Sequence, residues 1–236
     1  MTKQKNNFLK VSEKFFSIQG EGKTVGVPAI FLRLGGCNLL CKSKDWICDS
    51  IEVWSNSNKV DFKDVFDKDD IMNLRRGVHL VITGGEPLLH QRQVARFLDW
   101  IDYHYGFIPT IEVETNGTIL PDNELIYYVD YWNVSPKLSN SGESFDKRFN
   151  KEALQFFNGS PSTGWKFVIA ERNDVIEFFN DFNFIHKDKR ISFMPAGDSL
   201  ESIAKSEKLV VELCKEMNIR YCPRLQINIY NQATGV

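Results

Sequence analysis

Short apolar runs recur along the chain and alternate with amphipathic segments. Each run has the length and composition of a buried strand. The runs lie at 29–32, 78–82, 110–113, 132–134, 165–169 and 191–194. Apolar residues at helical spacing between them predict helices, one around 94–101 and another around 203–213, with Asp198 and Glu201 in capping-box spacing at the start of the latter.

This alternation of strands and helices predicts a parallel sheet with helices outside it. About six strand–helix units can be counted, whereas a complete eight-unit barrel needs roughly 250 residues. We therefore expect a partial (β/α)6 barrel of the TIM type, with an open doubly wound sheet as the alternative. Arg224, Gln226 and Asn228 alternate with apolar residues, which predicts an extra C-terminal strand. The polar, charge-rich segment 55–76 is expected to be a solvated surface insertion.

The composition is that of one ordinary globular domain, residues 1–236, with 42% hydrophobic and 25% charged residues. The 29 Lys and Arg residues against 31 Asp and Glu give a formal net charge of -2, so the chain has no long-range attraction to nucleic acid or anionic lipid. We therefore expect a small-molecule substrate. Residues 1–7 are polar, and no apolar run approaches the roughly 20 residues of a membrane span, so we expect a cytoplasmic protein without a signal peptide.

Three of the five cysteines, Cys37, Cys41 and Cys48, fall within one short loop after the first parallel strand. Such clustering suits metal binding in a reducing compartment better than disulfides. A structural zinc site usually has four ligands, and no histidine lies near this loop, so three thiolates favour an iron–sulfur cluster with one open iron. Unpaired surface thiols are the alternative. For Cys214 and Cys222 we expect packing roles.

Clusters of small and polar residues follow four of the predicted strands. They lie at 83–87, 114–118, 135–137 and 195–197. Because the carboxyl ends of parallel strands share one edge, these clusters and the cysteine loop should converge on a single site. Gly84 and Gly85 match neither the dinucleotide fingerprint nor the P-loop, so nicotinamide and triphosphate sites lack their phosphate cradle.

Six short motifs, running nearly from end to end of the chain, carry a family resemblance. They are 16–22 (FSIQGEG), 31–37 (FLRLGGC), 83–87 (TGGEP), 114–118 (ETNGT), 134–137 (VSPK) and 224–226 (RLQ). With these motifs the sequence resembles the 7-carboxy-7-deazaguanine synthase (QueE) family of the radical S-adenosylmethionine superfamily. The resemblance implies the partial barrel of that superfamily.

The resemblance also implies a set of site residues. A 4Fe-4S cluster would be held by Cys37, Cys41 and Cys48 in the loop 35–50, with its open iron bound to S-adenosylmethionine. The residues implied for S-adenosylmethionine are Ile47, Asp49, Gly85, Glu86, Ser135, Pro136, Lys137, Met194 and Pro195. The residues implied for the substrate are Ile18, Gln19, Gly20, Arg33, Thr83 and the C-terminal carboxylate of Val236. The hydroxyl of Ser50 stands where the family has a threonine that ligates Mg2+.

The implied activity is a radical reaction. One electron from a donor such as flavodoxin or ferredoxin would cleave S-adenosylmethionine to methionine and a 5'-deoxyadenosyl radical. This radical would take hydrogen from C6 of 6-carboxy-5,6,7,8-tetrahydropterin, which would contract with loss of ammonia to 7-carboxy-7-deazaguanine, in queuosine or other 7-deazapurine biosynthesis. A homodimer is the family expectation. Two alternatives stay open: an activase of glycyl-radical enzymes, and a non-catalytic, cluster-binding regulatory protein.

The chain departs from the family inside the cysteine loop. Six residues, 42–47, separate Cys41 from Cys48, whereas most members have two at this point. The frame recovers afterwards, because Cys48, Asp49 and Ser50 follow as the family's Cys-Asp-Thr would. The longer segment therefore leaves the geometry of the third cysteine as the main question for the structure.

Overall fold

One curved sheet organises the protein. The computed structural model describes residues 7–43, 48, 50–185, 190–233 and 235. Within these residues, nine strands follow the order β3-β1-β2-β4-β5-β6-β7-β8-β9. Their bounds are β1 Phe8–Ile18, β2 Pro28–Leu34, β3 Asn58–Asp61, β4 His79–Gly84, β5 Ile111–Thr115, β6 Tyr131–Val134, β7 Thr163–Ile169, β8 Ile191–Pro195 and β9 Arg220–Tyr221. β1 pairs antiparallel with both β2 and β3, and every neighbouring pair from β2 to β9 is parallel.

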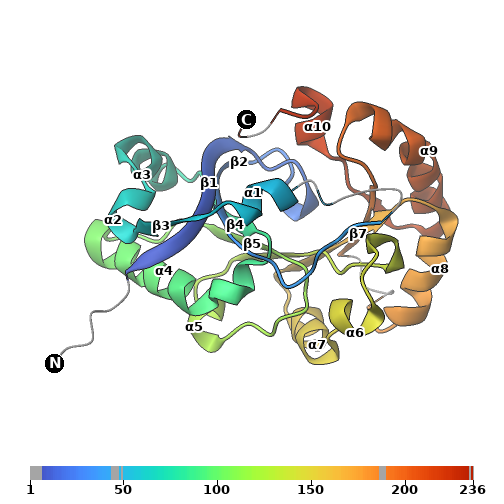
Figure 1. Ribbon diagram of the computed structural model, residues 1–236, viewed down its shortest axis with the longest axis horizontal. Coiled ribbons are helices and arrows are strands. Elements are labelled where there is room, and N and C mark those ends of the chain that lie inside the picture. The colour runs from blue at the N-terminus through green and yellow to red at the C-terminus, as the bar shows by residue number, and fades with distance from the viewer. Residues whose placement is uncertain (1–6, 44–47, 49, 186–189, 234, 236) are drawn as a thin grey trace.

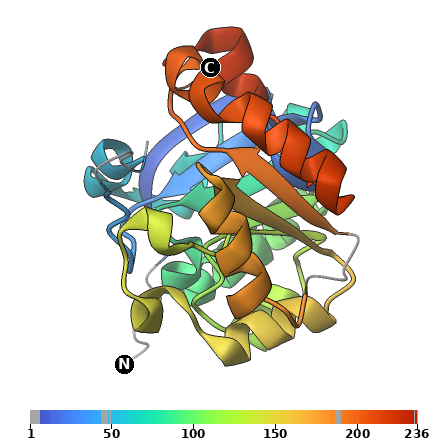
Figure 2. The ribbon, with the colours of Figure 1, turned by 90° about the vertical axis from the view of Figure 1, so that its right-hand side faces the viewer.

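Helices cover the outer face of this sheet (Figures 1 and 2). The outer helices are α4 Gln91–Tyr105, α5 Asn123–Ile126, α6 Phe145–Arg148, α7 Lys151–Gly159, α8 Arg172–Asp181 and α9 Leu200–Met217. The remaining helical segments are α1 Ile51–Ser55, α2 Phe62–Val65, α3 Lys68–Arg75, α10 Leu225–Tyr230, η1 Gly22–Thr24, η2 Pro87–His90 and η3 Ser139–Ser141. In the described part of the chain, no helix has the length and apolar character needed to span a membrane.

The two faces of the sheet have different chemistry. In β5, Ile111 and Val113 point outward and belong to the large hydrophobic core under the helices. Glu112 and Glu114 alternate with them and make hydrogen bonds on the inner side. Since successive side chains of a strand point to opposite faces, this alternation builds an apolar outer layer and a polar interior. The interior of the curved sheet is therefore available for a polar ligand site.

The predicted fold class is confirmed as a partial barrel. All six predicted strands are present and parallel to one another. Among the described residues, hydrogen bonding does not connect the two edge strands, β3 and β9, so the sheet stays open. The sequence reading missed β1, the 11-residue strand that pairs with β2. Most residues of β1 are partly buried on both faces of the strand. Its sequence therefore lacks the regular alternation of apolar and polar residues that would predict a strand.

The predicted C-terminal strand over 224–229 is wrong. These residues form helix α10, and the short strand β9 precedes them. The backbone N–H of Leu225 donates to the carbonyl of Gly20 at 3.0 Å, and Ile227 is buried. These tertiary contacts decide the conformation, because the preference of a short segment for a strand depends strongly on its packing context. Helix α9 confirms the helix predicted around 203–213, but its capping residue is Ser199, one position after the predicted Asp198.

The segment 55–76 is more deeply built into the fold than a solvated insertion would be. It supplies the edge strand β3, which pairs with β1. Phe62, Val65, Phe66 and Leu74 are all buried and belong to the main hydrophobic core. Charged residues are interspersed among these four apolar residues in the sequence, so their burial could not be predicted from the sequence pattern. They become buried when α2 and α3 pack against α4 and β1. Deleting this segment would therefore expose part of the core.

Candidate functional site

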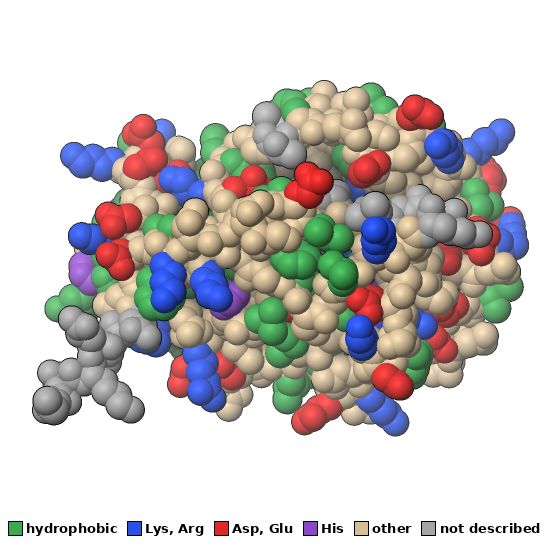
Figure 3. All heavy atoms as spheres, viewed as in Figure 1, with side chains coloured by type: hydrophobic (Ala, Val, Ile, Leu, Met, Phe, Trp, Pro, Cys, Tyr) green, Lys and Arg blue, Asp and Glu red, His purple; other side chains and the backbone are tan. Residues whose placement is uncertain are grey.

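A cavity of about 570 Å³ opens at the carboxyl ends of the parallel strands. Its wall includes the cysteine loop and residues from each of the four strand-end clusters, represented by Thr83, Thr115, Ser135 and Gly197. The predicted convergence on one rim is therefore confirmed. Its volume is in the range of pockets that hold cofactors and small substrates. Basic and acidic side chains are interspersed over the face in Figure 3, without a large area of one charge.

The three clustered cysteines all line this cavity. Cys41 is buried, and Cys37 and Cys48 are partly exposed. The N–H of Cys48 donates to the carbonyl of Cys41 at 3.0 Å, and the N–H of Leu39 donates to the sulfur of Cys37 at 3.4 Å. The hydrogen bond between Cys48 and Cys41 brings the third cysteine back to the second, so the longer spacing still delivers three thiols to one cavity wall.

Burial dominates the electrostatics of these thiols. It raises the pKa of Cys37 to about 11, and the nearby Glu86 and Cys41 add to the shift. The pKa of Cys41 is also raised by burial, although Lys137 opposes the shift. Three thiols that line one cavity fit an iron–sulfur cluster, whose positive charge would stabilise the thiolates.

Gly85 allows the cluster loop to pack against the end of β4. A Cβ atom at Gly85 would overlap the carbonyl of Gly36 and come too close to the side chain of Cys37. The next N–H, from Glu86, donates to the same Gly36 carbonyl at 2.9 Å. The absence of a side chain at Gly85 therefore sets the distance between the cysteine loop and the strand end.

Replacing Gly85 with alanine should push the loop away from the strand end. We expect Gly85→Ala to reduce cluster content and to lower activity by about 10- to 100-fold while the protein still folds, since small misplacements of reacting groups lower rates by factors of this size. Iron and sulfide analysis after anaerobic reconstitution measures the change. Gly159→Ala is the control, because a Cβ there meets no atom within 4 Å. Equal iron content in Gly85→Ala and wild type would contradict the packing argument.

Seven of the residues implied for S-adenosylmethionine are described by the structure, and they divide into those that line the cavity and those that do not. Gly85, Ser135, Lys137 and Met194 line the cavity, and Lys137 Nζ donates to Ser135 Oγ at 3.2 Å. The residues that are buried beside the cavity without lining it are Glu86, Pro136 and Pro195. Ile47 and Asp49 lie outside the described residues.

Glu86 makes structural hydrogen bonds at the rim of the cavity. Its carboxylate is fully buried and accepts hydrogen bonds from the N–H groups of Leu88 at 3.0 Å and Asn116 at 2.7 Å. It also accepts one from the hydroxyl of Thr115 at 2.8 Å. Burial raises its pKa to about 6, against these three donors. The side chain thus joins the ends of β4 and β5 and holds the rim together.

The residues implied for the substrate that the structure describes also line this cavity. They are Ile18, Gln19, Gly20, Arg33 and Thr83, whereas Val236 lies outside the described residues. The guanidinium of Arg33 is fixed by Glu13 at 2.7 Å and by the hydroxyl of Ser50 at 3.2 Å. Arg33 and the predicted magnesium ligand Ser50 therefore touch, although they lie 17 positions apart in the sequence.

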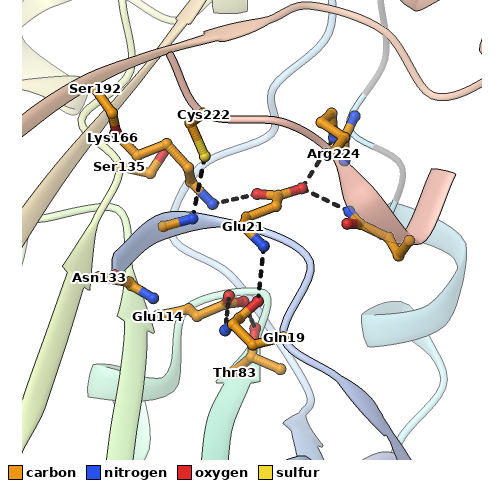
Figure 4. Close-up of polar contacts among 12 residues, drawn as sticks. Gln19, Glu21, Thr83, Glu114, Asn133, Ser135, Lys166, Ser192, Cys222 and Arg224 are labelled. Carbon is orange, nitrogen blue, oxygen red and sulfur yellow. Dashed lines mark hydrogen bonds and ion pairs between the residues drawn. The ribbon is translucent and has the colours of Figure 1, made fainter. Parts of the chain in front are cut away.

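A polar network inside the barrel was missed by the sequence reading (Figure 4). The amide nitrogen of Gln19 donates to Glu112 at 2.6 Å and to Glu114 at 3.2 Å. Thr83 donates to the other oxygen of Glu114 at 2.8 Å. Glu114 lines the cavity, so the network places a carboxylate on its wall. The alternation of glutamates with apolar residues in β5 is the sequence feature that could have predicted carboxylates inside the barrel.

Glu21 is the centre of a second buried network, also drawn in Figure 4. Its carboxylate pairs with Lys166 from β7, with Arg224 at 2.9 Å and with the amide of Gln226 at 2.7 Å. Burial alone would raise the pKa of Glu21, but Lys166 and Arg224 outweigh it and hold the pKa far below its ordinary value. Cys222 is buried beside this network, which agrees with a packing role. The network fastens the C-terminal segment to the barrel.

Comparison with known proteins places the chain in one family. The family model described as a 4Fe-4S single cluster domain matches residues 18–158. The 7-carboxy-7-deazaguanine synthase of Pyrobaculum aerophilum is 33% identical and covers 96% of this chain and 97% of its own length. That of Halobacterium salinarum is 30% identical, with coverages of 95% and 91%.

A solved structure agrees with these relatives. The crystal structure of QueE from Escherichia coli superimposes with a TM-score of 0.65 at 25% sequence identity, covering 92% of this chain and 93% of that one. Neither the activase nor the non-catalytic alternative is favoured by these similarities. The cysteine geometry, the partial barrel and the relatives agree, and the chain belongs to the 7-carboxy-7-deazaguanine synthase (QueE) family of radical S-adenosylmethionine enzymes.

Proposed function

We propose that this protein is a 7-carboxy-7-deazaguanine synthase, a carbon–nitrogen lyase that contracts the ring of 6-carboxy-5,6,7,8-tetrahydropterin with loss of ammonia. One observation carries the proposal. The three cysteines, four residues of the implied S-adenosylmethionine site and five of the implied substrate site line a single cavity. A radical reaction between cofactor and substrate needs both molecules in one enclosed space, and this arrangement supplies it.

The cofactor wall is formed by the cysteine loop and the ends of β4, β6 and β8. Cys37, Cys41 and Cys48 would hold the cluster, and Gly85 and Lys137, which line the same cavity, would border S-adenosylmethionine. When bound, these two groups supply the 5'-deoxyadenosyl radical that takes a hydrogen atom from C6 of the substrate. The protein itself orients the reacting carbon and excludes water.

Other residues of the cavity wall supply groups that match the substrate. Arg33 presents a planar set of donors to the carboxylate, and its Nη2 has no partner among the described residues. Glu114 offers acceptors for the amino-bearing edge of the pterin ring. The stacked rings of Phe15 and Phe31, with centroids 5.0 Å apart, line the cavity and provide an apolar surface for a flat heterocycle.

The finer features of the proposal concern the metal and the partners. The hydroxyl of Ser50 beside Arg33 would ligate Mg2+ and bring it to the substrate carboxylate. An electron donor such as flavodoxin or ferredoxin would reduce the cluster, and the enzyme would act as a cytoplasmic homodimer in queuosine or other 7-deazapurine biosynthesis. These features are supported by membership of the family.

The product assay tests the function directly. Cluster-replete protein is incubated anaerobically with the tetrahydropterin, S-adenosylmethionine, Mg2+ and a reductant, and products are identified by mass spectrometry. We expect 7-carboxy-7-deazaguanine together with ammonia, and no product when S-adenosylmethionine is omitted. A parallel sample with chelator tests the magnesium requirement. Cleavage of S-adenosylmethionine without any deazaguanine product would sink the proposal and point to a different substrate.

A further inference from the structure

Side-chain hydrogen bonds hold the first part of the cysteine loop. Residues 37–40 belong to no helix or strand, so no regular backbone ladder fixes their position. Within this stretch, the amide of Asn38 contacts two residues that follow β5, namely Asn116 and Thr118. Since Asn38 directly follows Cys37, these contacts connect a proposed cluster ligand to the carboxyl end of β5.

The three side chains close a ring of hydrogen bonds. Asn116 Nδ2 donates to Asn38 Oδ1 at 3.0 Å, and Asn38 Nδ2 donates to Thr118 Oγ1 at 2.8 Å. The hydroxyl of Thr118 donates in turn to Asn116 Oδ1 at 2.6 Å. Each side chain therefore gives one hydrogen bond and receives one within the ring.

A backbone group sets the direction of the ring. The N–H of Thr118 donates to Asn116 Oδ1 at 2.9 Å, and a main-chain N–H can only donate. The amide oxygen of Asn116 must therefore face Thr118, which turns its nitrogen towards Asn38. Asn38 then has to present its oxygen to Asn116 and its nitrogen to Thr118. The orientation of the Asn38 amide thus follows from the backbone conformation of residues 116–118.

The strand side of the ring is anchored independently. The N–H of Asn116 donates to the buried carboxylate of Glu86 at 2.7 Å, and Asn150 Nδ2 donates to the carbonyl of Thr118 at 2.8 Å. Asn116 and Thr118 are both buried, whereas Asn38 is exposed. The ring therefore ties an exposed residue of the cysteine loop to a well-anchored part of the rim.

We propose that Asn38 is a positioning residue, which acts through the ring with Asn116 and Thr118 to hold the loop between Cys37 and Cys41 in one conformation before the cluster binds. Ordering ligands in advance reduces the conformational entropy that is lost on binding. The inference rests on the proposed function, which assigns the cluster to this loop. The ring itself belongs to the metal-free chain, so it can be tested without the cluster.

Hydrogen–deuterium exchange in cluster-free protein tests the ring directly. Thr118→Val removes the hydroxyl but keeps the shape of the side chain, so it breaks two of the three ring bonds. We expect the amides of residues 37–40 to exchange about 10-fold faster than in wild type, since losing such bonds favours local opening by about this factor. Thr118→Ser keeps the hydroxyl and should exchange at the wild-type rate. Thr110→Val is the matched control, because it makes the same change directly before β5 and outside the cavity.

The cluster-loaded enzyme provides a second readout. In Thr118→Val and Asn38→Leu, we expect an altered EPR spectrum of the reduced cluster with S-adenosylmethionine and an about 10-fold slower formation of 7-carboxy-7-deazaguanine. The double variant should be no more than about twofold slower than either single variant, because both changes break the same ring. Thr118→Ser should keep the wild-type spectrum and rate.

The outcomes separate the inference from the function. Wild-type exchange in Thr118→Val, or equal defects in Thr118→Ser and Thr118→Val, would overturn the inference and leave the function standing. Multiplied losses in the double variant would overturn it too, because the two residues would then act independently. If wild-type enzyme forms no deazaguanine while the exchange results hold, the function fails and the positioning of the loop by Asn38 stands.

Discussion

The Cys41→Ala variant is expected to assemble no stable four-iron cluster and to form product at less than about one hundredth of the wild-type rate. Cys41 is the most buried of the three clustered cysteines and lies at the centre of their hydrogen-bonded loop. The variant keeps only two of the three thiols that would hold the cluster. The loss should therefore be nearly complete.

Iron and sulfide content after anaerobic reconstitution, together with visible absorption and product analysis, measures this effect. Cys214→Ala is the matched control, because Cys214 is buried in α9 and does not line the cavity. It should keep its cluster and its activity, with only a modest decrease in stability. Full iron content in Cys41→Ala would show that the cysteine loop does not hold the cluster as inferred.

The second large effect concerns stability rather than chemistry. Glu21→Gln should lower the free energy of unfolding by about 3–5 kcal/mol, because it removes the counter-charge from the buried Lys166. Urea titration of the cluster-loaded protein under anaerobic conditions measures the change. Arg172→Met is the control, since it breaks the exposed ion pair with Glu216 at 2.9 Å and should cost less than about 1 kcal/mol.

The same carboxylate predicts a pH dependence. The pKa of Glu21 is lower in the folded protein than its ordinary value of 4.5, so folding favours the ionised form. Its contribution to stability is therefore present above pH 4.5 and is lost as the pH falls below that value. Wild type should lose stability more steeply than Glu21→Gln in this range. Parallel slopes for the two proteins would contradict the assigned role of the ion-pair network.

Two sequence predictions failed for the same physical reason. The alternation of Arg224, Gln226 and Asn228 is compatible with a strand, but the contacts of α10 with Gly20 and Glu21 make it a helix. The charge-rich segment 55–76 hides four buried apolar residues that reach the main core. In both cases the local pattern is weak, and contacts with distant parts of the chain determine the conformation.

The parallel strands, their helices and the three clustered cysteines could be predicted, because hydrophobic periodicity and ligand spacing are local properties. The shared rim could be predicted too, since parallel strands share one edge. The hydrogen bond of Cys48 to Cys41 and the contacts of Glu21 with Lys166, Arg224 and Gln226 depend on tertiary packing. These partners are up to 205 positions apart in the sequence, so no local pattern could predict their contact. Buried polar pairing depends on the three-dimensional packing of the chain.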